Sequence, residues 1–235
     1  MPPSVFSTHR TFLREFRRRF HTTGAVLPSS RFLAAALARF VREGSESAVN
    51  EPRRILEVGP GTGSVTDKIV AGMRPADRLD LVEINEQFVA LLNRRFDEEP
   101  ELQAVSDRVR ILNQPIEQAA DGEPYDLIVS GLPLNNFSVA DVQQILGVLE
   151  GLLKPGGRLS FFEYFFIRAA RAVVSRGKER ERLRGIGGTL REMLRRGEIR
   201  RELIWLNTPP AWVHHVEFPN GNLDAGNVEM GDSAE

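Results

Sequence analysis

The fold of this 235-residue chain is decided by the stretch Ile55-Leu56-Glu57-Val58-Gly59-Pro60-Gly61-Thr62-Gly63. A short, mostly apolar, β-favouring run leads into a loop with glycine at every second position, and a helical pattern begins at Ser64. This order predicts a strand, a tight turn and a helix start, with a backbone bare enough for a ligand to lie against it. The next strand-like run, Leu79–Glu83, ends in a carboxylate, which at this spacing can accept both hydroxyls of a ribose.

The glycine spacing indicates which kind of nucleotide binds. A dinucleotide fingerprint reads G-x-G-x-x-G and brings a helix N-terminus to a pyrophosphate. This loop reads G-x-G-x-G, and Glu57 stands two residues before its first glycine. An acid there repels phosphate and suits a ligand with a cationic end, such as an amino-acid ammonium. The pattern E-x-G-x-G-x-G resembles the first motif of class I S-adenosylmethionine methyltransferases; a glycine turn without ligand and a different nucleotide cofactor are the alternatives.

The resemblance to these methyltransferases implies a set of cofactor-binding positions. Glu57 would orient the methionine end, and Glu83 would hold the ribose hydroxyls. Gln114 follows the third strand, where related enzymes often have an acid for the adenine amino group, and a glutamine oxygen can also accept that bond. The other implied positions are Gly59, Gly61 and Gly63 for backbone access, Ile84 against the adenine, Pro115, Ile116 and Ser130. A plain packing role is the alternative for Ile84, as it is for Pro133.

Strand-like and helix-like runs alternate along the chain and predict an α/β fold. The expected strands are Ile55–Val58, Leu79–Glu83, Val109–Leu112, Tyr125–Ser130 and Arg158–Tyr164, and the expected helices are Val65–Met73, Glu86–Phe96 and Val139–Leu153. Two late runs, Glu202–Leu206 and Trp212–Phe218, flank a short connection that implies an antiparallel pair. We therefore expect a Rossmann-like, seven-stranded, mostly parallel sheet with an antiparallel last strand. Glycines 185, 187 and 188 are expected to break a basic helical stretch before that pair.

Charge is distributed unevenly along the chain, although the net charge is −1. Residues 1–42 hold eight arginines and one acidic residue, and residues 168–201 hold twelve Lys and Arg residues against four acidic ones. The end of the chain is polar, acidic and glycine-containing. We expect basic amphipathic N-terminal helices over 1–42, a cofactor-binding domain over 43–218 and a disordered acidic tail over 219–235.

The N-terminal segment has the pattern of an interfacial membrane helix. On a helix, its apolar side chains fall on one face and its arginines, which lie within 10–19, border or oppose that face; the apolar residues are Phe6, Phe12, Leu13, Phe16 and Phe20. The alternative is a helix whose aromatic face packs on the sheet. The excess of cations in 168–201 also favours contact with anionic lipid, although mixed charges at helical spacing are typical of a solvated face.

Composition excludes several classes of site and sets the expected location. The chain has no cysteine, so disulfides, thiolate metal sites and cysteine nucleophiles are excluded. His214 and His215 are adjacent in a strand-like run, so they point to opposite faces and cannot share a metal. Residues 1–5 show no apolar signal core, and the aromatic run 161–167 is too short to span a bilayer. We expect a cytoplasmic protein bound peripherally to the inner face of the membrane.

Two further segments carry a closer resemblance. The runs Thr23-Gly24-Ala25-Val26-Leu27-Pro28-Ser29-Ser30-Arg31 and Val129-Ser130-Gly131-Leu132-Pro133-Leu134-Asn135-Asn136-Phe137 resemble the bacterial phospholipid N-methyltransferase family, over roughly residues 10–218. That family methylates phosphatidylethanolamine stepwise to phosphatidylcholine. The resemblance implies a substrate site lined by Thr23, Pro28, Ser29, Ser30, Leu132 and Pro133. Tyr164 is the candidate catalytic residue, because its hydroxyl can bind a phosphate oxygen or the acceptor amine; a half-buried strand tyrosine without such a role is the alternative.

The residues that end and follow the fourth expected strand indicate whether the acceptor is a lipid amine or a nucleobase. Enzymes that methylate an aromatic exocyclic amine have N-P-P-Y or D-P-P-Y there, with an amide or acid for the amine and a ring to stack on the base. This chain has Ser130-Gly131-Leu132-Pro133-Leu134, which favours an aliphatic amine and makes nucleic acid an unlikely partner. Phe137 as a displaced stacking ring keeps a relative of the rRNA adenine dimethylases open.

Two further alternatives concern the acceptor and the activity. The family often follows the position of Tyr164 with a Gly-Pro loop, whereas this chain continues Phe165-Phe166-Ile167-Arg168. An ornithine lipid, which also carries an amine on an acylated carrier, is therefore an alternative acceptor. A membrane-binding protein with a vestigial cofactor site is the alternative outside enzymes.

Overall fold

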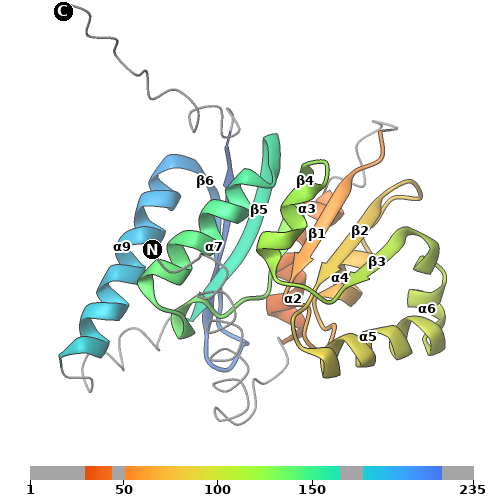
Figure 1. Cartoon of the computed structure of the whole chain (residues 1–235), viewed down its shortest axis with the longest axis horizontal. Coiled ribbons are helices and arrows are strands. Elements are labelled where there is room, and N and C mark those ends of the chain that lie inside the picture. Colours follow the sequence, from red (N-terminus) through yellow and green to blue (C-terminus); the bar gives the residue numbers. More distant parts are fainter. Residues whose placement is uncertain (1–29, 44–50, 165–176, 219–235) are drawn as a thin grey trace, which may run out of the picture.

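The computed structural model describes residues 30–43, 51–164 and 177–218, which form one seven-stranded sheet with helices on both faces (Figure 1). The strand order is β3-β2-β1-β4-β5-β7-β6. In chain order the strands are β1 (Arg54–Val58), β2 (Arg78–Val82), β3 (Val109–Leu112), β4 (Tyr125–Ser130), β5 (Leu153–Tyr164), β6 (Glu198–Ile204) and β7 (Ala211–Glu217).

Two helical layers bury the two faces of the sheet in separate hydrophobic clusters. One layer consists of α2 (Arg31–Leu37), α3 (Arg39–Glu43), α4 (Thr66–Val70), α5 (Glu86–Glu98) and α6 (Pro100–Gln103). The other consists of the short helix η3 (Ile116–Asp121), α7 (Val139–Gly151) and α9 (Lys178–Gly197). Two more short helices are η2 (Ser106–Arg108) and η4 (Leu134–Asn136). None of the helices in the described ranges is long and apolar enough to cross a bilayer.

The direction of the strands confirms the predicted fold. β1 pairs in parallel with β2 and β4, and the pairs β2–β3 and β4–β5 are also parallel. β7 runs antiparallel to both of its neighbours. The strand order reverses between β1 and β4, and ligands of open α/β sheets bind outside the carboxyl ends of the strands at such a switch point. We call this side of the molecule the carboxyl edge.

The predicted break in the basic helical stretch is wrong, because α9 runs without interruption through Gly185, Gly187 and Gly188. The packing explains the first of these glycines. A Cβ added at Gly185 would lie 2.6 Å from Cγ2 of Val139 on α7. Glycine therefore allows α9 to approach α7 closely, and the buried contacts of α9 outweigh the low helix propensity of these residues.

Several element boundaries differ from the sequence prediction. The helix expected over Val65–Met73 is shorter, since α4 ends at Val70. β5 begins at Leu153 rather than at Arg158, and its register with β4 shifts between Tyr125 and Leu127. β6 begins and ends earlier than expected.

Some predictions fall on residues outside the described ranges. The basic amphipathic helix and its arginines at 10–19 lie there, as do the substrate-site residues Thr23, Pro28 and Ser29. The tail over 219–235 and the first part of the basic segment 168–201 lie there as well. These remain predictions.

Candidate active site

The glycine loop lies at the carboxyl end of β1, beside β2 and β4. The Gly59 amide donates to the Val82 carbonyl at 2.9 Å, and the Gly131 amide donates to the Val58 carbonyl at 2.8 Å. Gly61 has a φ of +57°, and a Cβ added there would meet nothing within 4 Å. The loop therefore turns through a left-handed conformation beside open space, where a ligand can approach its backbone.

Glu57 is fully buried at the end of β1, directly before this loop. The Thr66 hydroxyl, from the first turn of α4, donates to its Oε2 at 2.7 Å. Its other oxygen, Oε1, is buried without a hydrogen-bond partner among the described residues. Burial raises the pKa of Glu57 to about 8, against the lowering effect of the bond from Thr66. A buried carboxylate oxygen without a partner can bind a ligand ammonium, which would also favour the charged form.

Glu83 follows β2 and contacts the glycine loop directly. Its Oε2 accepts from the Gly61 amide at 3.1 Å, and its Oε1 accepts from the Asn85 amide at 2.9 Å. Burial raises the pKa of this carboxyl, and the bonds from backbone amides counter part of the rise. Each oxygen keeps a second lone pair, so the carboxylate can also accept hydroxyl donors.

Arg95, on α5, fixes the far side of the loop. Its Nη1 donates to the Thr62 carbonyl at 2.9 Å, and its other nitrogens bind Asp67 and Glu99 at 2.6–2.8 Å. A Cβ at Gly63 would collide with this guanidinium. Arg95 and Thr66 could not be predicted from the sequence, because both act across tertiary contacts that no local motif encodes.

The residues that follow β3 lie next to Glu83. The Asn113 side chain donates to the Glu83 carbonyl at 2.9 Å, which connects the end of β3 to the carboxylate strand. Gln114 and Pro115 follow and are half-buried, as is Ile84. The Ile116 side chain instead packs into the cluster beneath α7.

The β4 exit loop lies directly beside the glycine loop. Ser130 is buried, and its hydroxyl accepts from the Leu132 amide at 3.4 Å. A Cβ at Gly131 would lie 2.6 Å from the Gly59 carbonyl oxygen, so the two loops touch backbone to backbone. The Leu132 side chain covers Gly59, and Pro133 is buried. The structure thus brings Ser130, Leu132 and Pro133 together with the predicted cofactor residues.

The Phe137 side chain, which the sequence left open as a displaced stacking ring, is buried in the hydrophobic cluster beneath α7 and α9. Leu134 is buried in the same cluster. The Asn135 side-chain oxygen is buried without a partner among the described residues, and the backbone carbonyl of Asn135 accepts from Arg182 of α9 at 3.0 Å. The β4 exit loop therefore exposes neither Leu134 nor Phe137 to a base.

Tyr164 and Ser30 lie farther from the glycine loop. Tyr164 is the last residue of β5, two strands from β1, and burial raises the pKa of its phenol. The phenol therefore stays protonated at neutral pH and can hydrogen-bond a ligand but cannot act as a base. Ser30 caps α2, since its hydroxyl accepts from the Leu33 amide at 3.2 Å.

His214 and His215 do point to opposite faces of β7, but neither reaches solvent. The His214 ring stacks on Phe161 and its Nδ1 lies 2.7 Å from Glu198. The His215 Nδ1 lies 2.7 Å from the Ser160 hydroxyl. Burial lowers the pKa of His215 to about 4, so it is neutral at physiological pH.

These residues fit S-adenosylmethionine. The free buried oxygen of Glu57 suits the ammonium of the methionine end, the Glu83 carboxylate suits ribose hydroxyls, and the open side of Gly61 leaves room for the ligand. S-adenosylmethionine, when bound, supplies a methyl group on a positively charged sulfur.

Comparisons with known proteins agree with this arrangement. Residues 56–159 match the family described as a methyltransferase domain. An ornithine lipid N-methyltransferase from Singulisphaera acidiphila is 29% identical over 146 residues, which is 62% of this chain and 72% of that protein. A ribosomal RNA small subunit methyltransferase A from Synechococcus sp. is 32% identical over 110 residues, or 46% of this chain and 38% of that protein.

The fold also matches solved methyltransferase structures. The O-methyltransferase from Bacillus cereus, in complex with SAH, superposes with a TM-score of 0.61 at 15% identity and covers 92% of this chain and 93% of that one. At this identity the likeness concerns the fold. With the domain match and the two buried carboxylates beside the glycine loop, the chain is an S-adenosylmethionine-dependent methyltransferase of the α/β class I fold.

Proposed function

We propose that this enzyme methylates the primary amine of a membrane lipid head group, with phosphatidylethanolamine and ornithine lipid as the two candidate acceptors. One observation carries the proposal: Phe137, the aromatic residue of the β4 exit loop, is buried in the core and offers no exposed ring for a base to stack on. An aliphatic amine needs no stacking ring. It is nucleophilic once deprotonated, and the enzyme has mainly to hold it in line with the methyl group.

The cofactor roles follow from the contacts at the carboxyl edge. Glu57 binds the ammonium of the methionine end, and Glu83 binds the ribose. The backbone of Gly59, Gly61 and Gly63 lies along the ligand, and Arg95 holds this loop in place. Ile84, Gln114 and Pro115 form the adenine side, whereas the Ile116 side chain belongs to the core. Ser130, Leu132 and Pro133 line the passage to the acceptor.

Fewer of the residues that we propose for the acceptor side lie in the described ranges. Tyr164 lies at the same edge as Ser130 and, as a protonated phenol, donates a hydrogen bond to a phosphate or carboxylate oxygen of the head group. By the family resemblance, Thr23, Pro28, Ser29 and Ser30 form one wall of the substrate site. The basic segments 10–19 and 168–201 hold the enzyme peripherally at the anionic inner face of the membrane, where each cation contributes about 1 kcal/mol.

Two comparisons bear on the acceptor. The relative named as an ornithine lipid N-methyltransferase supports a lipid amine as the acceptor and supports ornithine lipid as one of the two candidates. The relative named as a ribosomal RNA methyltransferase supports the competing reading, in which the basic segments bind nucleic-acid phosphates.

The test is methyl transfer by the purified enzyme from labelled S-adenosylmethionine. The acceptors are vesicles with phosphatidylethanolamine, vesicles with ornithine lipid, and ribosomal RNA, with Glu57→Gln as the control for cofactor-dependent label. We expect label in one or both lipids and none in RNA. Label in RNA alone would overturn the proposal.

A further inference from the structure

The connection between β6 and β7, residues 205–210, lies at the carboxyl edge beside the acceptor side of the site. Ile204 pairs with Ala211, and Ala211 pairs with Tyr164 at the end of β5. The connection therefore extends beyond the carboxyl end of β5, on the side where the β4 exit loop also lies (Figure 1).

Large apolar side chains are exposed on this connection and beside it. Trp205 is 61% exposed and Leu206 is 68% exposed, and Phe32, in the first turn of α2, is 40% exposed. The fourth exposed large hydrophobic residue of the described ranges, Ile199, lies near the opposite end of β6. We call Phe32, Trp205 and Leu206 the edge patch. Apolar surface gathered in one place marks an interaction site more often than scattered residues do.

Asn207 holds the edge patch together. This residue is buried, and its side-chain oxygen accepts from the Ser30 amide at 3.1 Å. Its side-chain amide donates to the Pro209 carbonyl at 2.7 Å. One side chain thus closes the β6–β7 connection and joins it to the start of α2. The hydrogen bonds of Asn207 therefore connect the segment that carries Trp205 and Leu206 to the helix that carries Phe32.

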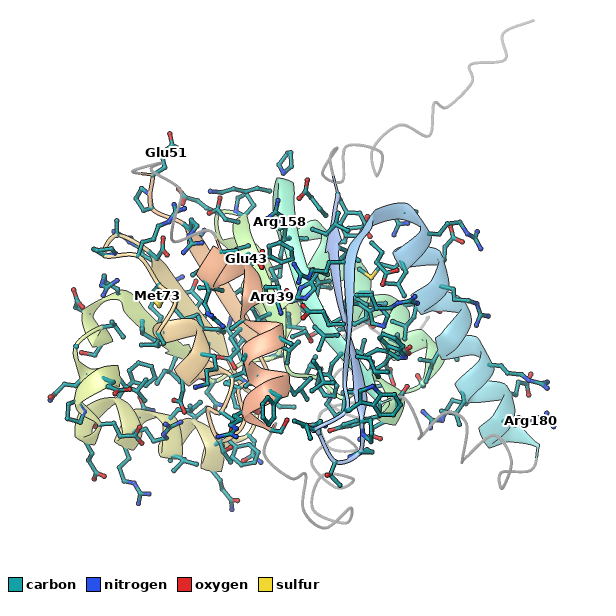
Figure 2. All side chains as sticks on the ribbon, turned by 180° about the vertical axis from the view of Figure 1, so that it is seen from behind. Arg39, Glu43, Glu51, Met73, Arg158 and Arg180 are labelled. Atoms are coloured by element: carbon teal, nitrogen blue, oxygen red, sulfur yellow. The ribbon has the colours of Figure 1, made fainter. Side chains whose placement is uncertain are left out.

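One cation borders the edge patch, and two others are exposed on the first half of α9. Arg31 is exposed, and its guanidinium lies 4.8 Å from the centre of the Phe32 ring. Arg180 and Arg184 are exposed on the first half of α9, with the acidic Glu181 between them. Figure 2 shows Arg180 at the end of α9 on the same side of the molecule as the β6–β7 connection.

Exposed tryptophan and leucine with arginine at the margin match the chemistry of an anionic bilayer surface. Tryptophan favours the interfacial region of a membrane, apolar side chains favour the acyl boundary, and arginine favours anionic head groups. A partner protein would explain the apolar residues but would not require cations around them.

We infer that the edge patch is the surface that enters the head-group region of an anionic bilayer, with Trp205 and Leu206 inserted and Arg31 and Arg180 at the lipid phosphates. The inference rests on the proposed function, because it places the site where a lipid amine can reach it without leaving the membrane. It is separate from the predicted contacts of residues 10–19.

Tryptophan fluorescence tests the insertion, since the chain has two tryptophans, Trp205 and Trp212. The full-length Trp212→Phe variant reports Trp205 alone. On vesicles of phosphatidylcholine and phosphatidylglycerol, its emission should shift to shorter wavelength and be quenched by acyl chains brominated near the head group. The matched Trp205→Phe variant, which reports the half-buried Trp212, should change little. Unchanged Trp205 emission, with or without vesicle binding, overturns the inference.

Two other occupants give distinct results, and both overturn the inference. If residues 1–29 cover the edge patch, Trp205 is shielded from iodide before any vesicle is added, at every protein concentration. If a second copy covers it, the shielding grows with concentration together with the sedimentation coefficient.

Binding and activity separate this inference from the proposed function. Replacing Trp205 and Leu206 together by alanine should weaken vesicle binding about tenfold or more and leave cofactor affinity unchanged. Ile199→Ala, near the other end of β6 and also exposed, should change neither. Lipid methylation without Trp205 insertion would overturn the edge patch alone, whereas insertion without lipid methylation would overturn the proposed function alone.

Discussion

The Thr66 hydroxyl donates to Oε2 of Glu57 at 2.7 Å, and Oε1 of the same buried carboxylate is left without a partner among the described residues. A carboxylate in this state is costly to ionise, and burial raises its pKa to about 8. A cation bound at Oε1 would remove that cost. The ligand-free protein is therefore poised for a cationic ligand at one atom.

Cofactor binding should release a proton from Glu57. At about pH 6.5 the ligand ammonium is already charged, whereas Glu57 is mostly protonated in the ligand-free protein. Calorimetric titration with S-adenosylhomocysteine, in buffers of different ionisation enthalpy, should show about one proton released per ligand. Glu57→Gln should show none. Equal proton release by the wild type and the variant would contradict the assignment.

Glu57 should also make the ligand-free protein less stable at alkaline pH. Its pKa is higher in the folded than in the unfolded chain, so its contribution to the free energy of unfolding falls as pH rises from about 4.5 to about 8. Glu57→Gln should remove this pH dependence, and denaturant unfolding at two pH values measures it. A variant that loses stability with pH as the wild type does would rule out Glu57 as the source.

Replacing Glu57 and replacing Glu83 should affect the binding of different parts of the ligand. Glu57→Gln should weaken S-adenosylhomocysteine binding about 10–100-fold and leave adenosine, which lacks the ammonium, unaffected. Glu83→Gln should weaken both ligands, because it alters the ribose contact and the bonds from Gly61 and Asn85. Competition binding measures both ligands. Loss of adenosine binding in Glu57→Gln would show that the variant disrupts the loop rather than one contact.

Arg95 should stiffen the glycine loop through the Thr62 carbonyl. Lysine cannot form the forked set of bonds, so Arg95→Lys should speed amide exchange in residues 62–64 about tenfold. Arg94→Lys is the matched control, since Arg94 is exposed and only approaches Glu98 at 3.8 Å. Equal exchange in the two variants would show that Arg95 does not hold the loop.

The glycines of α9 should differ in their tolerance of alanine. Gly185→Ala would press on Val139 and lower the free energy of unfolding by about 1–3 kcal/mol. Gly188→Ala meets nothing within 4 Å and should raise it by about 0.5–1 kcal/mol through helix propensity. Denaturant unfolding of the two variants measures the difference. Equal shifts would mean that α9 does not pack on α7 as described.

Apolar runs and the glycine motif predicted the sheet and the position of Glu57 and Glu83 beside the loop, because short apolar runs and glycine turns are local signals. The unbroken α9 could not be predicted, since its glycines are accommodated by Val139 from a distant helix. The burial of Phe137 could not be predicted either, because the sequence of a loop does not tell whether a helix from elsewhere in the fold covers its aromatic residue.

The most direct measurement is mass spectrometry of total lipids from bacteria that contain phosphatidylethanolamine and ornithine lipid but no methylated forms, and that produce either the wild-type chain or Glu57→Gln. The account predicts N-methylated head groups of one or both lipids with the wild type and none with the variant. Unchanged lipids together with new methyl groups in ribosomal RNA would contradict it.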